Sequence, residues 1–321
     1  MHALVFDDFG EADVLQYREF PDPVVMPGHL LIDVKASGLN FADIYRRRGT
    51  YRGMGKPPYV NGYEGAGIVS AVGEGVSDFQ VGDRIGFVDV ARANVTKLNV
   101  DKDRAIPLPD NISFEEAASV LLQGLTAQYL CEDSTPVAKD HWILVHSAAG
   151  GVGRHLVRYC LSKGAHVIAM ASSQSKRQVA EDLGAEFTLG YDGDWPAIVC
   201  DMTKGGADVV FDSVGSTLAK SIAATRRKGT IVTFGMSDAN PEPVSPLVLM
   251  ETSKSLVGGD LWDYLDTKTE RRSRSQRLFQ LLADGVLQIP PIEVFPLRDG
   301  ISAHRRLEDR SFTGKIIFQS E

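Results

Sequence analysis

The sequence has few cysteines, and their spacing excludes the sites that cysteines usually build. Only Cys131, Cys160 and Cys200 are cysteines among 321 residues, and none belongs to a C-x-x-C pair. This spacing suits neither a disulfide framework nor a zinc site made of cysteines, so we expect a reducing compartment. The seven histidines show no metal-ligand spacing either.

Long apolar runs and an excess of positive charge are also missing. No apolar stretch reaches the roughly eighteen residues of a membrane-spanning helix, and the first residues, MHALVFDDFG, lack the basic start of a signal peptide. A net charge of -8 and a pI near 5.4 argue against nucleic acid as a partner. We therefore expect a cytoplasmic protein without a membrane partner. The basic clusters at 46–48 and 271–274 are predicted to be solvated surface.

The length allows two domains, and hydrophobic periodicity divides the chain into three regions. Up to about residue 122 the pattern indicates short, glycine-bounded strands with little helix. Apolar strands then alternate with helical segments, which is typical of βαβ units and a parallel sheet. The strands are expected at 142–148, 166–171, 207–211 and 230–235, and the helices at 151–164 and 216–229.

The last sixty or so residues are too short for a domain of their own. They contain an amphipathic helix at 275–285 and a closing strand at 314–320. We therefore predict an α/β protein with a β-rich domain of residues 1–122, completed by 260–321. A doubly wound, parallel-sheet domain of residues 123–259 lies between these two parts in the sequence.

A glycine-rich turn follows the first strand of the alternating region. The stretch ILVHSAAGGVGRHLV has Ala148 where a G-x-G-x-x-G fingerprint has its first glycine, a position that needs only a small side chain. Gly150 and Gly151 would let the backbone approach a pyrophosphate, and Gly153 would allow close packing of helix on strand. The helix that follows offers free N–H groups at its N-terminus. The turn is predicted to hold a dinucleotide.

The end of the second strand indicates which dinucleotide. An NAD site usually has an acidic residue there, but this chain reads ASSQSKR and offers Ser172, Ser173 and Lys176. Hydroxyl donors and positive charge suit a 2'-phosphate, so NADPH is the expected cofactor. Lys176 and Arg177 could instead only decorate the start of an exposed helix, which would leave the missing acid unexplained.

Motifs along the whole chain resemble the zinc-independent medium-chain dehydrogenases/reductases of the quinone oxidoreductase, or zeta-crystallin-like, group. They include GLNFADIYRRRGTY, GYEGAGIVSAVGEGV, VHSAAGGVG, GADVVFDSVG and TGKIIF. The resemblance implies a GroES-like catalytic domain interrupted by a Rossmann domain, an active site between the two, and a homodimer.

The resemblance also implies catalysis without a metal. Zinc-dependent relatives have a cysteine at Asn40, a histidine at Tyr63 and a four-cysteine structural lobe, and this chain has none of these. Glu64, left without a metal, is expected to make a hydrogen bond or an ion pair. His146, on the strand before the glycine turn, is expected to be a packing residue.

The functional residues are those that match the family's motifs. Asn40, Tyr45 and Tyr51 are implied to lie near the nicotinamide, where a tyrosine could stack on a flat substrate or donate a hydrogen bond to it; simple aromatic packing is the alternative. Besides the glycine turn with Val152 and the ASSQSK segment, the implied cofactor contacts are Thr126, Tyr129, Tyr191, Phe234, Gly235, Gly259, Leu261 and Arg310.

Three functions are compatible with these residues. The first is an NADPH-dependent reduction of quinones, in which the nicotinamide supplies the chemistry and the protein supplies position. The second is reduction of the activated double bond of an enal, enone or enoyl thioester. The third is a structural or RNA-binding protein that merely binds NADPH, against which the acidic pI argues.

Overall fold

The computed structural model describes residues 1–51, 55–309 and 311–320, and the chain divides into two compact units. Unit 1 consists of Met1–Leu122, Leu265–Gln280 and Ile289–Glu321, and unit 2 of Gln123–Tyr264 and Leu281–Gln288. Helix α2 (Phe114–Tyr129) begins in unit 1 and ends in unit 2. Within the described residues no helix is both long enough and apolar enough to span a membrane.

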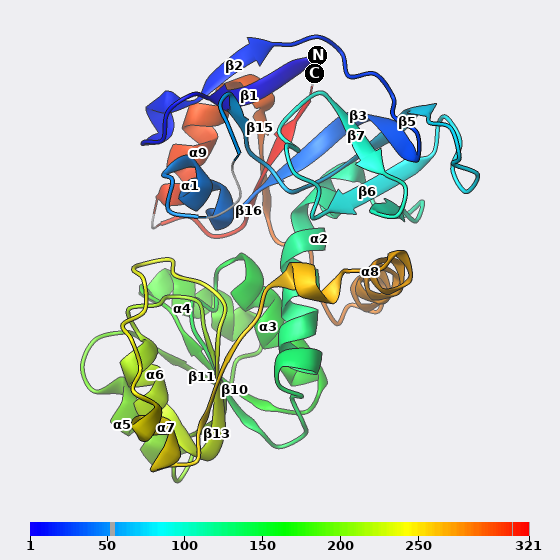
Figure 1. Ribbon diagram of the computed structural model, residues 1–321. Coiled ribbons are helices and arrows are strands. Elements are labelled where there is room, and N and C mark those ends of the chain that lie inside the picture. The colour runs from blue at the N-terminus through cyan, green and yellow to red at the C-terminus, as the bar shows by residue number, and fades with distance from the viewer. Residues whose placement is uncertain (52–54, 310, 321) are drawn as a thin grey trace. The chain divides into compact units, whose positions relative to one another are not determined.

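Unit 1 is built on antiparallel strands, as its turn-rich sequence predicts (Figure 1). The larger sheet has the order β15-β16-β3-β5-β6-β8 with β7 paired to β3, and the smaller has the order β2-β1-β4. In the long strand β3 side chains alternate between half-buried and buried up to Ala36, and the residues from Ala36 to Leu39 are all buried. The strands are β1 (His2–Phe6), β2 (Gln16–Glu19), β3 (His29–Leu39), β4 (Tyr59–Val60), β5 (Glu64–Val72), β6 (Arg84–Val88), β7 (Lys97–Asp101), β8 (Ala105–Pro107), β15 (Ile292–Pro296) and β16 (Lys315–Gln319).

Helices also belong to this unit. Helix α1 (Phe41–Arg47) starts where the carboxylate of Asp43 accepts the Asn40 N–H at 2.9 Å. Helix α2 starts at a capping box, in which Ser113 and Glu116 each accept the other's backbone N–H. The tail adds α8 (Lys268–Ala283) and α9 (Gly300–Glu308). Among the described residues before 122, α1 and the first part of α2 are the only α-helices, so the expectation of little helix there is confirmed.

Unit 2 is a six-stranded sheet in which every pair of neighbouring strands is parallel. Its order, β11-β10-β9-β12-β13-β14, is the 3-2-1-4-5-6 order of a Rossmann fold, which confirms the predicted doubly wound sheet. Helices α5 and α6 pack on one face and α3 on the other (Figure 1). The strands are β9 (Trp142–Val145), β10 (His166–Met170), β11 (Phe187–Leu189), β12 (Ala207–Asp212), β13 (Thr225–Thr233) and β14 (Ser255–Gly258). The helices are α3 (Gly151–Ser162), α4 (Gln174–Asp182), α5 (Trp195–Met202), α6 (Leu218–Ala224) and α7 (Pro246–Met250).

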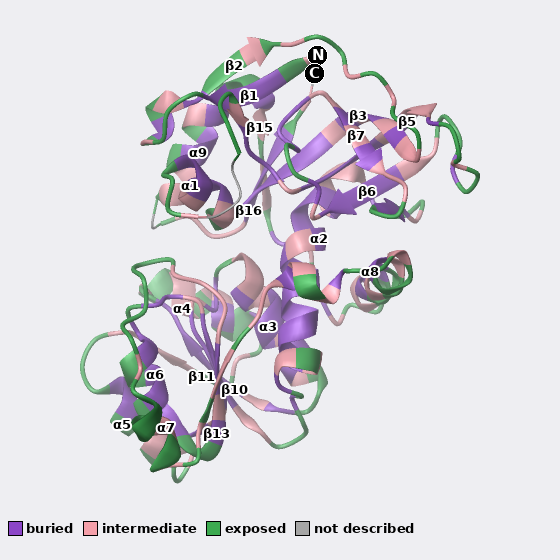
Figure 2. Cartoon of the chain, viewed as in Figure 1, coloured by how far each residue is buried: buried purple, intermediate pink, exposed green. Residues whose placement is uncertain are grey.

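One predicted helix is too long. The segment 216–229 is helical only from Leu218 to Ala224, and β13 begins at Thr225. The strand pairs with Ala207 of β12, shifts register, and pairs again from Thr230. The central strands β9, β10 and β12 are buried except at Trp142, His166 and Asp208 (Figure 2), as expected for a sheet covered on both faces.

Candidate functional site

The glycine turn of unit 2 joins β9 to α3. Gly150 is the N-cap of α3, and its N–H donates to the carbonyl of Ser147 at 2.8 Å. A Cβ at Gly153 would lie 2.3 Å from that carbonyl oxygen and 2.9 Å from the Cα of Ala148, so only glycine lets the helix approach the strand so closely. A Cβ at Gly150 would meet one atom at 3.1 Å and the next only at 3.9 Å. The turn is therefore tight behind Gly153 and open at Gly150.

The predicted cofactor residues of unit 2 gather at one edge of its sheet. The glycine turn follows β9, Ser172 and Ser173 follow β10, Tyr191 follows β11, Phe234 and Gly235 follow β13, and Gly259 follows β14. Because the carboxyl ends of parallel strands share one edge, these segments lie together. Ligands of such sheets bind at this edge, next to the point where the strand order reverses between β9 and β12.

The end of β10 carries hydroxyl groups and a cation. Ser173 is the N-cap of α4 and accepts the Lys176 N–H at 3.3 Å. Ser172 is exposed, whereas Lys176 and Arg177 are half-buried. No carboxylate follows β10 before α4.

Tyr191 belongs to a buried polar chain beneath the glycine turn. Its hydroxyl accepts the Ser147 N–H at 3.0 Å and lies 3.4 Å from Nδ1 of His146. Nε2 of His146 is 3.0 Å from the Ser221 hydroxyl, which in turn donates to Asp212 at 2.6 Å. Because Asp212 takes the only proton of Ser221, His146 must donate from Nε2 and accept at Nδ1.

Burial sets the protonation states along this chain. It lowers the pKa of His146 to about 4 and raises the pKa of Tyr191 to about 12, so both are neutral near pH 7. Burial alone would raise the pKa of Asp212, but His146 and the hydrogen bond from Ser221 lower it. Asp212 also accepts the N–H groups of Val214 and Gly215. The chain thus ties the loop after β9 to the loop after β12, and His146 is a packing residue as expected.

The other predicted cofactor residues of unit 2 are held by packing. The Tyr129 hydroxyl donates to the Gly259 carbonyl at 3.1 Å, and its ring stacks on Tyr264 with centroids 4.5 Å apart. Thr126 and Leu261 are buried. The Phe234 N–H donates to the carbonyl of Asp212 at 3.0 Å. Arg310 lies outside the described residues.

In unit 1, Asn40 meets two charged side chains that are buried with it. Asn40 precedes α1, Glu64 begins β5 and Lys315 begins β16. Lys315 Nζ donates to Glu64 Oε1 and, at 2.8 Å, to Asn40 Oδ1, while Asn40 Nδ2 donates to Glu64 Oε1 at 2.7 Å. The Leu122 N–H donates to the other Glu64 oxygen at 2.8 Å. Glu64 therefore makes the ion pair and hydrogen bonds that its sequence context predicts.

A second buried pair lies beside the predicted catalytic tyrosines. Arg46 Nη1 is 3.6 Å from the Asp43 carboxylate, and the Arg46 guanidinium lies 3.6 Å from the ring centre of Tyr63 and 4.9 Å from that of Tyr51. Burial raises the pKa of Asp43 although Arg46 opposes this. The rings of Tyr45 and Tyr51 have centroids 6.2 Å apart, so these two predicted residues lie together.

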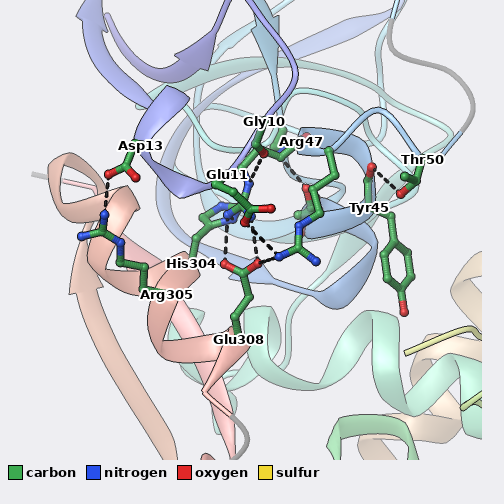
Figure 3. Close-up of polar contacts among 12 residues, drawn as sticks. Gly10, Glu11, Asp13, Tyr45, Arg47, Thr50, His304, Arg305 and Glu308 are labelled. Atoms are coloured by element: carbon green, nitrogen blue, oxygen red, sulfur yellow. Dashed lines mark hydrogen bonds and ion pairs between the residues drawn. The ribbon is translucent and has the colours of Figure 1, made fainter. Parts of the chain in front are cut away.

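The basic clusters are not simply solvated surface, and that prediction was wrong. Arg46, Arg47 and Arg271 are at most 3% exposed. Arg47 donates to Glu308 at 2.8 Å and to the Gly10 carbonyl at 3.1 Å, which joins α1 to α9 (Figure 3). Figure 3 also shows the side chain of Tyr45 extending away from this ion-pair cluster.

Sequence reasoning missed several of these contacts. Lys315 could have been suspected as a lysine inside an apolar closing strand, but its partners are about 250 or more residues away. The hydrogen-bonded series Tyr191–His146–Ser221–Asp212 joins residues that no sequence motif or periodicity connects. Cys131 and Cys160, far apart in sequence, have sulfurs 3.7 Å apart in the fold, both as thiols. Among the described residues no group of three or more His, Cys, Asp and Glu side chains could hold a metal ion.

Two protein-family models match the chain, and proteins of known function are similar to it over nearly its whole length. The model of the alcohol dehydrogenase GroES-like domain matches residues 26–139, and that of the zinc-binding dehydrogenase matches 151–271. A quinone oxidoreductase of Pseudomonas aeruginosa is 34% identical over 97% of both chains. A 2-haloacrylate reductase of a Burkholderia species is 33% identical over 98% of both. A solved structure of Escherichia coli quinone oxidoreductase complexed with NADPH is 33% identical and superposes with a TM-score of 0.95. The superposition covers 99% of this chain and 100% of that chain.

Proposed function

Because the chain belongs to the quinone oxidoreductase family of medium-chain dehydrogenases/reductases, we propose that it is an NADPH-dependent quinone reductase. Two electrons and one proton pass from NADPH to the quinone as a hydride, and a second proton from solvent or a nearby hydroxyl completes the hydroquinone. The two units would divide the work along the predicted boundaries. Residues 1–122 and 260–321 would bind the quinone, and residues 123–259 most of the cofactor, with Leu261 and Arg310 completing the cofactor site.

The observation that carries the choice of cofactor is the end of β10. An NAD site would have a carboxylate there for the ribose 2'-hydroxyl, but Ser172, Ser173 and a half-buried Lys176 stand in its place. A 2'-phosphate carries close to two negative charges and accepts hydrogen bonds from hydroxyl and ammonium groups. These residues therefore fit NADPH and offer no carboxylate for an NAD ribose.

The glycine turn fits the rest of a dinucleotide. The open side of Gly150 leaves room that a Cβ would fill, and the first N–H groups of α3 favour an anion. Gly151 and Val152 would face the pyrophosphate, while Gly153 keeps the helix on the strand. Tyr191 would steady this turn from below, because its hydroxyl already accepts the Ser147 N–H.

The remaining predicted residues would serve the nicotinamide and the substrate. Thr126, Tyr129, Phe234, Gly235, Gly259 and Leu261 would bound the nicotinamide half, and Arg310 the phosphate half. Tyr45 and Tyr51 offer ring faces for a flat quinone, and Asn40 offers a carboxamide. With reactants held in place, the protein contributes orientation and exclusion of water.

Steady-state kinetics would test this function. Under anaerobic conditions, NADPH oxidation should accelerate with ortho- or para-quinones well above the uncatalysed rate. If no quinone in a broad panel is reduced faster than in buffer, the proposed function is wrong.

The 2-haloacrylate reductase similarity favours a second candidate, reduction of an activated double bond. A hydride delivered to the β-carbon of an enone or enal needs a hydrogen-bond donor at the carbonyl, and Asn40, Tyr45 or Tyr51 could supply one. Turnover of enones and enals without turnover of quinones would favour this candidate.

We further propose that the protein is a cytoplasmic homodimer. Strand β14 ends the strand order of the unit 2 sheet, and Leu247, Val248 and Met250 of neighbouring α7 are 44–72% exposed. An open strand edge beside apolar side chains suits pairing with a second copy. Three cysteines without a C-x-x-C pair suit a reducing compartment. Sedimentation of the wild type and of Met250→Glu would test the assembly.

A further inference from the structure

The Asn40 carboxamide is held at both of its ends. Its oxygen accepts from the Lys315 ammonium at 2.8 Å, and its nitrogen donates to Glu64 Oε1 at 2.7 Å. All three side chains are at most 6% exposed, so water does not replace these partners. Three segments far apart in the sequence therefore converge on one amide.

This arrangement permits only one orientation of the amide. A turn of 180° would set the N–H groups of Asn40 against an ammonium and its oxygen against a carboxylate. Both contacts would become repulsive, and each buried group left without a partner costs about 1–3 kcal/mol. The orientation is thus fixed by charge.

The buried cluster of Asn40, Glu64 and Lys315 restricts a neighbouring strand and costs free energy of desolvation. A Cβ at Gly38 would lie 2.2 Å from Glu64 Oε1 and 2.4 Å from the Ala118 carbonyl oxygen, so the neighbouring strand must carry glycine there. Burying an ammonium and a carboxylate costs several kcal/mol before they pair, and well-packed apolar residues often stabilise a core as well or better. Stability alone is therefore a poor explanation for the pair.

We propose that Lys315 and Glu64 are positioning residues that present Asn40 as a hydrogen-bond donor to the carbonyl oxygen of the substrate. The inference rests on the proposed function. When a hydride reaches a quinone or an enone, negative charge grows on the carbonyl oxygen. An N–H donor fixed in advance stabilises that charge, whereas an amide free to turn would also offer its oxygen.

A mutant cycle tests whether the pair acts through Asn40. Lys315→Met with Glu64→Gln removes both charges together and leaves no unpaired buried ion. We expect kcat to fall about tenfold with little change in the KM for NADPH, because a displaced catalytic group can cost up to roughly 100-fold. Asn40→Leu should lower kcat by about 100-fold, the loss typical of one oxyanion donor.

The triple variant, Lys315→Met/Glu64→Gln/Asn40→Leu, shows whether Lys315 and Glu64 act through Asn40. If the pair acts only through Asn40, the triple variant has the same kcat as Asn40→Leu. A further tenfold loss in the triple variant, or an unchanged kcat in the double variant, would overturn the inference. A wild type that reduces neither quinones nor enones would instead refute the proposed function.

Two controls separate positioning from general damage. Arg47→Met with Glu308→Gln removes another buried ion pair of unit 1, and kcat should stay within about twofold of wild type. Lys315→Arg keeps the cation and should retain most of the activity. If Lys315→Met/Glu64→Gln does not fold, Lys315→Gln/Glu64→Gln, which also removes both charges, replaces it in the cycle.

A spectroscopic readout is independent of turnover. The side-chain amide ¹⁵N resonances of Asn40 can be assigned by their absence in Asn40→Leu. In the wild type the two protons should differ in shift and exchange slowly, because a charged partner holds each end of the group. In Lys315→Met/Glu64→Gln they should move toward free-amide values, and unchanged resonances would contradict the inference.

Discussion

Two glycines of one turn should respond in opposite ways to the same added methyl group. In Gly153→Ala the new Cβ would lie 2.3 Å from the Ser147 carbonyl oxygen and 2.9 Å from the Ala148 Cα. Both are backbone atoms that cannot turn aside, so α3 must move off the strand. Overpacking of this kind costs about 1–3 kcal/mol, which lowers the Tm by roughly 5 °C.

Gly150→Ala should leave stability almost unchanged. Its backbone, at φ -80° and ψ 175°, is open to any residue, and the added Cβ has one tight contact, 3.1 Å from the Ser147 carbonyl oxygen, which a shift of a few tenths of an ångström relieves. The methyl group would instead fill the space that we assign to the NADPH pyrophosphate. We expect the Kd for NADPH to rise at least about tenfold, equal to 1.4 kcal/mol or more.

Thermal unfolding with and without NADPH, together with fluorescence titration of NADPH, separates the two effects. Gly151→Ala is an intermediate case, because its Cβ would meet only the end of the Gln123 side chain, which can turn away. A Gly153→Ala protein as stable as wild type would refute the packing argument. A Gly150→Ala protein with unchanged NADPH affinity would refute the placement of the pyrophosphate.

Three further predictions concern charge. Burial lowers the pKa of His146 to about 4 and the pKa of His304 to about 3, so below pH 6.5 both histidines take up protons when the protein unfolds. Each histidine should therefore lower the free energy of unfolding by about 1 kcal/mol per pH unit as the pH falls below 6.5. Urea unfolding at several pH values should show that this free energy depends less steeply on pH in His304→Gln than in the wild type. Arg47→Met should cost about 1–3 kcal/mol, because it removes the hydrogen bonds of a fully buried guanidinium to Gly10 and Glu308, although Arg48 still pairs with Glu308. Arg48→Met, at a 43% exposed side chain, should cost under about 1 kcal/mol, and equal losses in urea unfolding would contradict this difference. Ser172→Asp should shift the ratio of kcat/KM for NADPH over NADH at least about tenfold toward NADH, and an unchanged ratio would remove Ser172 from the phosphate site.

Local patterns predicted the parallel sheet well. The expected strands of unit 2 agree with β9, β10 and β12 within a few residues, because apolar runs bounded by glycine and polar residues mark buried parallel strands. The start of β13 was missed, since the residues at 225–229 are polar and continue a helical pattern. Helix α1 was missed because it is short and its capping carboxylate is itself buried.

The site was predictable only where a motif is local. The glycine turn and the ASSQSK segment each lie within one strand-to-helix connection, so their positions in the fold follow from the sequence pattern. Arg47 looks like an ordinary surface charge in the sequence, and the apolar strand around Lys315 only hints that this lysine is buried. Neither signal identifies the distant carboxylate partners that make burial possible. Contacts of this kind leave no periodicity to detect.

The most direct test of the account compares cofactors in one assay. Initial rates are measured anaerobically with NADPH and with NADH, at matched concentrations, against quinones, enones and acyl thioesters. The account predicts that NADPH supports quinone reduction at a kcat/KM at least about tenfold above that of NADH. Equal use of the two cofactors would contradict the assignment at the end of β10, and the absence of quinone turnover with either would contradict the function itself.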